Sequence, residues 1–171
     1  MIDLERYIRN IPDFPKPGIQ FKDITPLLAD HHAFKNVIDQ FINTFKDSNV
    51  QKVVGIEARG FLLGTPISLA LNAGFVPIRK PGKLPYETVQ HTYTLEYGTD
   101  TIEMHKDAIR PHENVLIIDD LLATGGTVEA TCKLIEQTKG NIIGIGFLIE
   151  LLFLNGKEKI SGYPVHSLIK F

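Results

Sequence analysis

Apolar residues recur along this chain with two spacings, one typical of amphipathic helices and one typical of short buried strands. The helical spacing is clearest over residues 34–45, where Asp30 suits an N-cap. The apolar positions there are Phe34, Val37, Ile38, Phe41, Ile42 and Phe45. Further helices are predicted over residues 3–10, 61–72 and 126–139. Gly74 is expected to end the helix over 61–72.

Short β-branched runs predict strands at residues 53–56, 75–78, 115–118 and 141–149. The proline-rich stretch 11–18 predicts an irregular connector, 19–24 a short extended piece, and 79–91 a mobile loop. Residues 92–95 and 101–104 predict a hairpin. Strands alternating with helices predict an α/β fold, a mostly parallel twisted sheet flanked by helices, in one domain over residues 1–171. Its active site is expected outside the carboxyl ends of the strands.

Composition and charge narrow the possible functions. The net charge is -2, so we expect no bulk attraction to nucleic acid or to acidic membranes. The single cysteine, Cys132, provides neither an internal disulfide nor a multi-cysteine zinc site, and we expect it to be buried and inert. No signal peptide and no apolar run of about 20 residues stand out, so we expect a cytoplasmic protein without a membrane partner.

The stretch that carries chemistry is DDLLATGGT, residues 119–127, after the strand at 115–118. Glycines let a ligand approach backbone N–H groups, and a helix N-terminus favours a phosphate. Asp119 and Asp120 suit the diol of a sugar, and they could help to organise Mg²⁺ through the sugar or its waters. Together these features indicate a ribose 5-phosphate site, although an ordinary strand–loop–helix connection is the alternative. The stretch is neither a Walker A sequence nor a dinucleotide fingerprint.

The longer string VLIIDDLLATGGT resembles the signature of the type I phosphoribosyltransferases, which bind phosphoribosyl pyrophosphate (PRPP). Three further stretches resemble the members that act on adenine: IPDFPKPGIQFKDITPLL (11–28), GIEARGFLLG (55–64) and YTLEYG (93–98). The resemblance implies the type I phosphoribosyltransferase fold, with a small N-terminal hood over residues 1–30 and a flexible loop. It also implies a homodimer that uses Mg²⁺, held mainly through PRPP, to convert adenine and PRPP into AMP and pyrophosphate in purine salvage.

The resemblance assigns roles to individual residues. The ribose 5-phosphate would be bound by Asp119, Asp120, Ala123, Thr124, Gly125, Gly126 and Thr127. Pyrophosphate would be bound by Arg59, Arg79, Lys80 and Lys83, in part from a neighbouring subunit. Adenine would stack on Phe21 and pair with the backbone at Gln20 and Lys22. Glu96 would act with Asp119 and Asp120 in catalysis, in a closing loop that also carries Tyr97. More ordinary roles stay open: Lys83 as a surface charge, Phe21 as core, and Glu96 as an exposed residue.

Two other functions remain open at this point. One is a phosphoribosyltransferase for another base, such as xanthine. The other is a PRPP-sensing regulator that keeps the fold and has lost catalysis. The sequence at residues 19–23 disfavours the first, and Glu96 together with the short chain disfavours the second.

Overall fold

The computed structural model describes residues 2–94 and 98–171, and they form two compact units, residues 2–40 and 41–171. In these ranges no helix is both long enough and apolar enough to cross a lipid bilayer.

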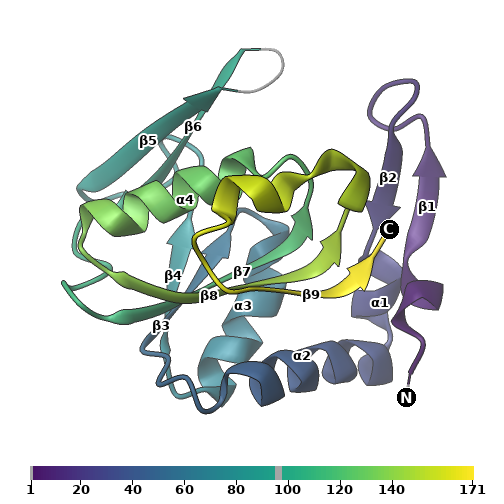
Figure 1. The fold of residues 1–171 in the computed structure, drawn as a ribbon, viewed down its shortest axis with the longest axis horizontal. Helices are drawn as coiled ribbons and strands as arrows, with labels where there is room; N and C mark the ends of the chain where they lie inside the picture. The colour runs from purple at the N-terminus through teal and green to yellow at the C-terminus, as the bar shows by residue number, and fades with distance from the viewer. Residues whose placement is uncertain (1, 95–97) are drawn as a thin grey trace. The chain divides into compact units, whose positions relative to one another are not determined.

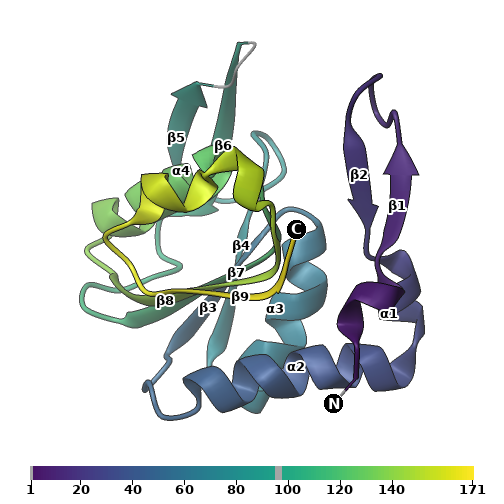
Figure 2. The ribbon, with the colours of Figure 1, turned by 45° about the vertical axis from the view of Figure 1, so that its right-hand side comes forward.

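The larger unit is built on a parallel sheet (Figure 1). Within the described residues its strand order is β4 (Gly74–Ile78), β3 (Lys52–Ile56), β7 (Asn114–Leu122), β8 (Asn141–Glu150) and β9 (Val165–Lys170). Helix α3 (Arg59–Ala70) covers one face and α4 (Gly126–Gln137) the other (Figure 2). Two short 3-10 helices, η2 (Leu152–Leu154) and η3 (Gly156–Ile160), follow β8. The mostly parallel α/β architecture is therefore confirmed.

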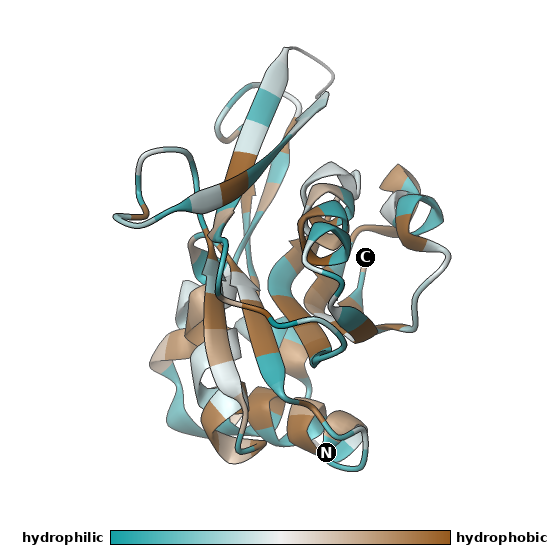
Figure 3. Ribbon diagram, turned by 90° about the vertical axis from the view of Figure 1, so that its left-hand side faces the viewer, coloured by the Kyte–Doolittle hydropathy of each residue, from teal (hydrophilic) through white to brown (hydrophobic). Residues whose placement is uncertain are grey.

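The core lies where the strands meet the helices, and the central strands are largely brown in Figure 3. Ile117 and Ile118 of β7 are fully buried, which explains their apolar, β-branched sequence. Glycines at positions 144 and 146 of β8 admit aromatic rings, because a Cβ at either position would lie 2.8 Å from a ring carbon of Phe45 or Phe41. These two rings come from the end of α2 (His31–Phe45).

An antiparallel hairpin stands beside the sheet. Its strands are β5 (Thr88–Thr94) and β6 (Thr99–His105), with Thr94 opposite Thr99 in the register. A backbone bridge between Arg79 and Glu103 joins the hairpin to the chain that leaves β4. β5 packs against α4, which brings hairpin side chains to the N-terminal end of that helix.

The smaller unit contains η1 (Leu4–Tyr7), the antiparallel pair β1 (Arg9–Pro12) and β2 (Gln20–Asp23), α1 (Thr25–Ala29) and the first turns of α2. Asp30 caps α2 as predicted, because its Oδ1 accepts a hydrogen bond of 2.9 Å from the Ala33 N–H.

Several sequence predictions of local structure were wrong. The helix predicted over 3–10 ends at Tyr7, since Arg9–Pro12 pairs with Gln20–Asp23 instead. β5 begins at Thr88, inside the loop predicted over 79–91. β7 continues past residue 118 to Leu122, so Asp119 and Asp120 lie inside the strand rather than after it. η2, η3 and β9 had no predicted counterpart.

Candidate functional site

A cavity of about 270 Å³ opens at the carboxyl ends of β3, β4 and β7, as expected for this kind of sheet. Its walls come from the ends of those three strands, from the start of α3, and from the β5–β6 hairpin. The lining residues are Ile56, Glu57, Ala58, Arg59, Ile78, Lys80, Tyr93, Asp100, Ile102, Asp119, Asp120, Leu121 and Thr127. Both cationic and anionic side chains therefore face one cavity.

A smaller hollow of about 80 Å³ lies next to the cavity and shares Asp119, Leu121 and Thr127 with it. It is lined by residues 121–128, which include all five predicted phosphate-binding residues, 123–127. Gly125 adopts a φ of 80° at the N-cap of α4, a left-handed conformation that favours glycine. The first turn of α4 then offers unpaired N–H donors and a partial positive charge, which suit a phosphate.

The phosphate loop, residues 123–127, is held from behind by η3. A Cβ at Gly156 would lie 2.1 Å from the Ala123 carbonyl oxygen, and a Cβ at Gly125 would lie 2.3 Å from the Gly156 carbonyl oxygen. Two backbones can approach this closely only because both residues are glycines. Gly156 is therefore a structural part of the loop, and it was absent from the sequence prediction.

The two adjacent carboxylates lie where the cavity and the hollow meet. Asp119 Oδ1 accepts a hydrogen bond of 2.9 Å from the Asp120 N–H. A Cβ at Gly60 would lie 2.8 Å from the same Asp119 oxygen, so this glycine brings α3 close to the acid. Arg59 Nε lies 2.9 Å from Asp120 Oδ2, and Asp120 is only 5% exposed. This is a close charge contact rather than an aligned hydrogen bond, since Oδ2 accepts no hydrogen bond from the described residues.

Burial raises the pKa of both acids. The charge of Asp120 raises the pKa of Asp119 further, so that it lies well above its ordinary value. The Arg59 guanidinium opposes the rise at Asp120 without cancelling it. The ionised pair is thus under-compensated in the described structure. Sugar hydroxyls or a divalent cation would stabilise its charge.

Two of the four predicted pyrophosphate-binding cations line the cavity, and the other two do not. Arg59 and Lys80 line the cavity. Arg79 donates from Nε and Nη2 to Glu57, at 3.1 and 3.3 Å, and the Lys80 N–H donates to Glu57 Oε2 at 2.9 Å. The Arg79 hydrogen bond lowers the pKa of Glu57 and keeps it ionised. Lys83 is exposed and lies outside the cavity lining.

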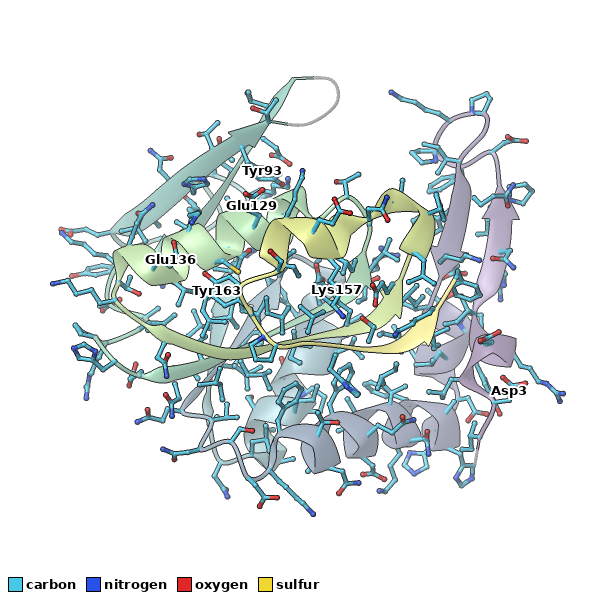
Figure 4. All side chains as sticks on the ribbon, in the orientation of Figure 1. Asp3, Tyr93, Glu129, Glu136, Lys157 and Tyr163 are labelled. Carbon is cyan, nitrogen blue, oxygen red and sulfur yellow. The ribbon has the colours of Figure 1, made fainter. Side chains whose placement is uncertain are left out.

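A polar network that the sequence did not predict connects the hairpin with Thr127 of α4 and with Lys80. The Tyr93 hydroxyl lies 3.0 Å from Thr127 Oγ1 and donates to Asp100 Oδ2 at 3.2 Å. Asp100 also forms an ion pair with Lys80. Burial alone would raise the pKa of Asp100, but the Lys80 hydrogen bond lowers it. Figure 4 shows Tyr93 at the end of α4 that carries Glu129. Tyr93 stands within the motif YTLEYG, which was the available signal; Asp100 had none.

The remaining predicted residues belong to the smaller unit or fall outside the described residues. Gln20, Phe21 and Lys22 form part of β2 in the smaller unit. Phe21 is half-buried, with its ring 5.2 Å from that of Phe14, and Lys22 Nζ donates to Asn10 Oδ1 at 2.7 Å. Their role toward adenine stays a prediction. Glu96 and Tyr97 lie outside the described residues.

Comparison with known proteins places this geometry in a family. Residues 24–167 match the phosphoribosyl transferase domain. The chain is 56% identical to the adenine phosphoribosyltransferase of Halothermothrix orenii over 99% of both chains, and 58% identical to that of Alkaliphilus metalliredigens over 99% of this chain and 100% of the relative.

Solved structures agree with this assignment. The adenine phosphoribosyltransferase of Thermoanaerobacter pseudethanolicus superposes with a TM-score of 0.96 at 51% identity, over 99% of this chain and 98% of that one. The adenine phosphoribosyltransferase of Giardia lamblia, solved with 9-deazaadenine, superposes with a TM-score of 0.94 at 40% identity. The match covers 99% of this chain and 96% of that one. A carboxylate pair and a glycine-rich helix start, on a fold shared over nearly the whole chain, place this protein in the phosphoribosyl transferase domain family, among the adenine phosphoribosyltransferases.

Proposed function

We propose that the reaction of this family takes place in the cavity at the carboxyl ends of β3, β4 and β7. In that reaction the N9 atom of adenine bonds to C1 of the ribose in PRPP. The bond from C1 to the pyrophosphate oxygen breaks, its electron pair leaves with pyrophosphate, and AMP forms. The observation that carries the proposal is the arrangement around Asp119 and Asp120. A phosphate loop lies on one side of the pair, and Arg59 and Lys80 line the cavity with it.

The phosphate loop is the proposed anchor for the 5-phosphate of the substrate. Backbone N–H groups and the hydroxyls of Thr124 and Thr127 would hold it at the start of α4. Because this group does not react, its binding energy can position C1 for attack.

Asp119 and Asp120 would accept hydrogen bonds from the two ribose hydroxyls. Their raised pKa values mark charge that the described residues leave under-compensated. The hydroxyl donors stabilise the ionised pair, and the pair in turn favours the positive charge that builds on the ribose ring as pyrophosphate departs.

Arg59, Lys80, Arg79 and Lys83 would bind pyrophosphate. Arg59 and Lys80 already face the cavity, paired with Asp120 and Asp100. Arg79 is held by Glu57, so pyrophosphate has to compete with that carboxylate for it. Lys83 is exposed, which fits a contact made only when pyrophosphate is bound or made to a second subunit.

The described residues contain no cluster of three His, Cys, Asp or Glu side chains that could hold a metal ion alone, but the Asp119 and Asp120 carboxylates line the cavity and are oxygen donors of the kind that Mg²⁺ prefers. Mg²⁺ would be held mainly through PRPP oxygens, with Asp119 and Asp120 near the ribose hydroxyls. When bound, it would neutralise charge on the leaving pyrophosphate.

Adenine would stack on Phe21 and pair with the backbone of Gln20 and Lys22. An adenine edge offers the N6 donor beside the N1 acceptor, which a backbone C=O and N–H can match. Hypoxanthine and guanine carry an oxygen acceptor at position 6 and an N1–H donor beside it. They would therefore leave backbone polar groups of this segment unpaired. Glu96 would accept the proton from N9, in a closing loop with Tyr97.

We further propose a cytoplasmic homodimer. Leu62 and Leu69 lie seven residues apart on α3 and are 48% and 75% exposed, and Phe153 of η2 is 72% exposed. A second copy of the chain would cover these apolar side chains. A dimeric mass in solution that falls to the monomer mass in Leu69→Asp would support this. A monomeric parent protein would contradict it.

The test of the proposed reaction is a panel of bases. Purified protein, PRPP and Mg²⁺ are mixed with adenine, hypoxanthine, guanine or xanthine in turn, and nucleotide formation is followed. AMP from adenine alone supports the whole proposal. Product from another base would leave the PRPP site in place and refute the role of residues 20–22. PRPP binding without any product would refute catalysis.

A further inference from the structure

The 3-10 helix η3 carries a lysine toward the phosphate loop. Gly156, its first residue, packs directly on the backbone of Ala123 and Gly125. A 3-10 helix has 3.0 residues per turn, so side chains three positions apart lie on the same face. Lys159 therefore shares the face of Gly156, the face that meets the loop. The yellow helical segment after β8 lies beside α4 in both Figure 1 and Figure 2.

The position of the Lys159 ammonium agrees with this geometry. Its Nζ would lie 3.9 Å from a Cβ built on Gly126, the first residue of α4. Lys159 is exposed, and within residues 2–94 and 98–171 no ion pair joins it to a carboxylate. The loop itself, residues 123–127, contains no lysine or arginine.

Electrostatics explain why this placement points to an anion. The N-terminus of a helix carries about half a positive charge, so a lysine ammonium beside it is repelled. An anion bound at the same place turns that repulsion into attraction from both sides. A phosphate ester carries nearly two negative charges at neutral pH, more than the end of one helix compensates.

We propose that Lys159 is a further binding residue for the 5-phosphate of PRPP and AMP, supplying the full positive charge that the loop lacks. The inference rests on the proposed function, because it requires the phosphate loop to hold this group. Lys159 contributes to binding and not to bond breaking, since the 5-phosphate is remote from C1 and does not react.

Lys157 provides the matched control. It lies on the same short helix and is also exposed, but it stands two positions from Lys159 and so does not share its face. Lys157 is one of the side chains labelled in Figure 4. Replacing Lys157 removes the same charge from the same element without removing it from the loop.

The experiment measures dissociation constants for ribose 5-phosphate and for pyrophosphate by calorimetry, with parent protein, Lys159→Gln, Lys159→Arg and Lys157→Gln. We expect Lys159→Gln to weaken ribose 5-phosphate binding by about three- to tenfold, and raised salt to shrink the difference. Pyrophosphate binding should stay unchanged, and Lys159→Arg should restore most of the affinity. In turnover, KM for PRPP should rise while kcat and KM for adenine stay near the parent values.

Other results would overturn the inference. Equal ribose 5-phosphate affinity in Lys159→Gln, Lys157→Gln and the parent protein would remove Lys159 from the site. A similar loss for pyrophosphate and ribose 5-phosphate would mean a general charge effect or altered folding. Failure of the parent protein itself to bind ribose 5-phosphate would overturn the proposed function, and this inference with it.

Discussion

Replacing Gly156 by alanine tests how the phosphate loop is held. The added Cβ would lie 2.1 Å from the Ala123 carbonyl oxygen, while ordinary van der Waals contact begins at 3.4 Å. Roughly 1.3 Å must therefore be gained by moving η3, the loop, or both, because the obstacle is backbone that no side-chain rotation can clear. Displacements approaching 1 Å at a substrate-positioning group can cost about a hundredfold in rate, and overpacking costs about 1–3 kcal/mol of stability.

The assay varies PRPP at saturating adenine and measures urea unfolding in parallel. We expect Gly156→Ala to lower kcat/KM for PRPP by about ten- to a hundredfold, with KM for adenine nearly unchanged. Gly162→Ala is the matched control, since a Cβ there meets no atom within 4 Å. The same PRPP kinetics in Gly156→Ala and Gly162→Ala would show that the close packing of η3 on the loop does not matter for function.

Three further predictions concern single side chains. Because burial and the Asp120 charge raise the pKa of Asp119, ionising it costs folding free energy. This cost is absent below the ordinary aspartate pKa and grows as pH rises toward the raised value, by about 1.4 kcal/mol for each pKa unit. Asp119→Asn should therefore have a higher urea midpoint than the parent protein at neutral pH. If this difference in midpoint stayed the same in acid, the ionisation of Asp119 would not be its cause. Tyr93→Phe removes the 3.0 Å contact with Thr127 and the 3.2 Å hydrogen bond to Asp100. It should raise KM for PRPP by about two- to tenfold, and an unchanged KM would make the network incidental. Burial raises the pKa of the Cys132 thiol to about 12, so iodoacetamide should label it only after unfolding in urea; rapid labelling of folded protein would contradict its burial.

The sequence predicted what depends on local pattern. Apolar periodicity located the long helices and the parallel strands, because burial of one helix face or of both strand faces leaves a direct trace in residue order. The same pattern predicted too short a β7, because two adjacent acids, Asp119 and Asp120, indicated the end of the strand. In the structure the backbone of Asp119 continues in register with Phe147 of β8 regardless of side-chain polarity.

The failures near the N-terminus and in the site have a common cause in long-range pairing. Leu4 and Ile8 are buried and four residues apart, which imitates a helix, but Asn10 pairs with Lys22 across a turn instead. Tyr93 and Gly156 reach the phosphate loop only through the three-dimensional fold. The motif YTLEYG singled out the segment that contains Tyr93, but not its contact with Thr127, and Gly156 lay in no motif. Both contacts span tens of residues, so local periodicity does not predict them.

The carboxylate pair is the centre of the proposed site, so the most direct test of that site replaces both acids. In Asp119→Asn together with Asp120→Asn, the side chains keep their size and lose the charge that would hold the ribose hydroxyls and favour positive charge on the ring. AMP formation from adenine and saturating PRPP should fall by at least about a hundredfold, while circular dichroism shows an intact fold. Turnover equal to that of the parent protein would contradict the assignment of the site.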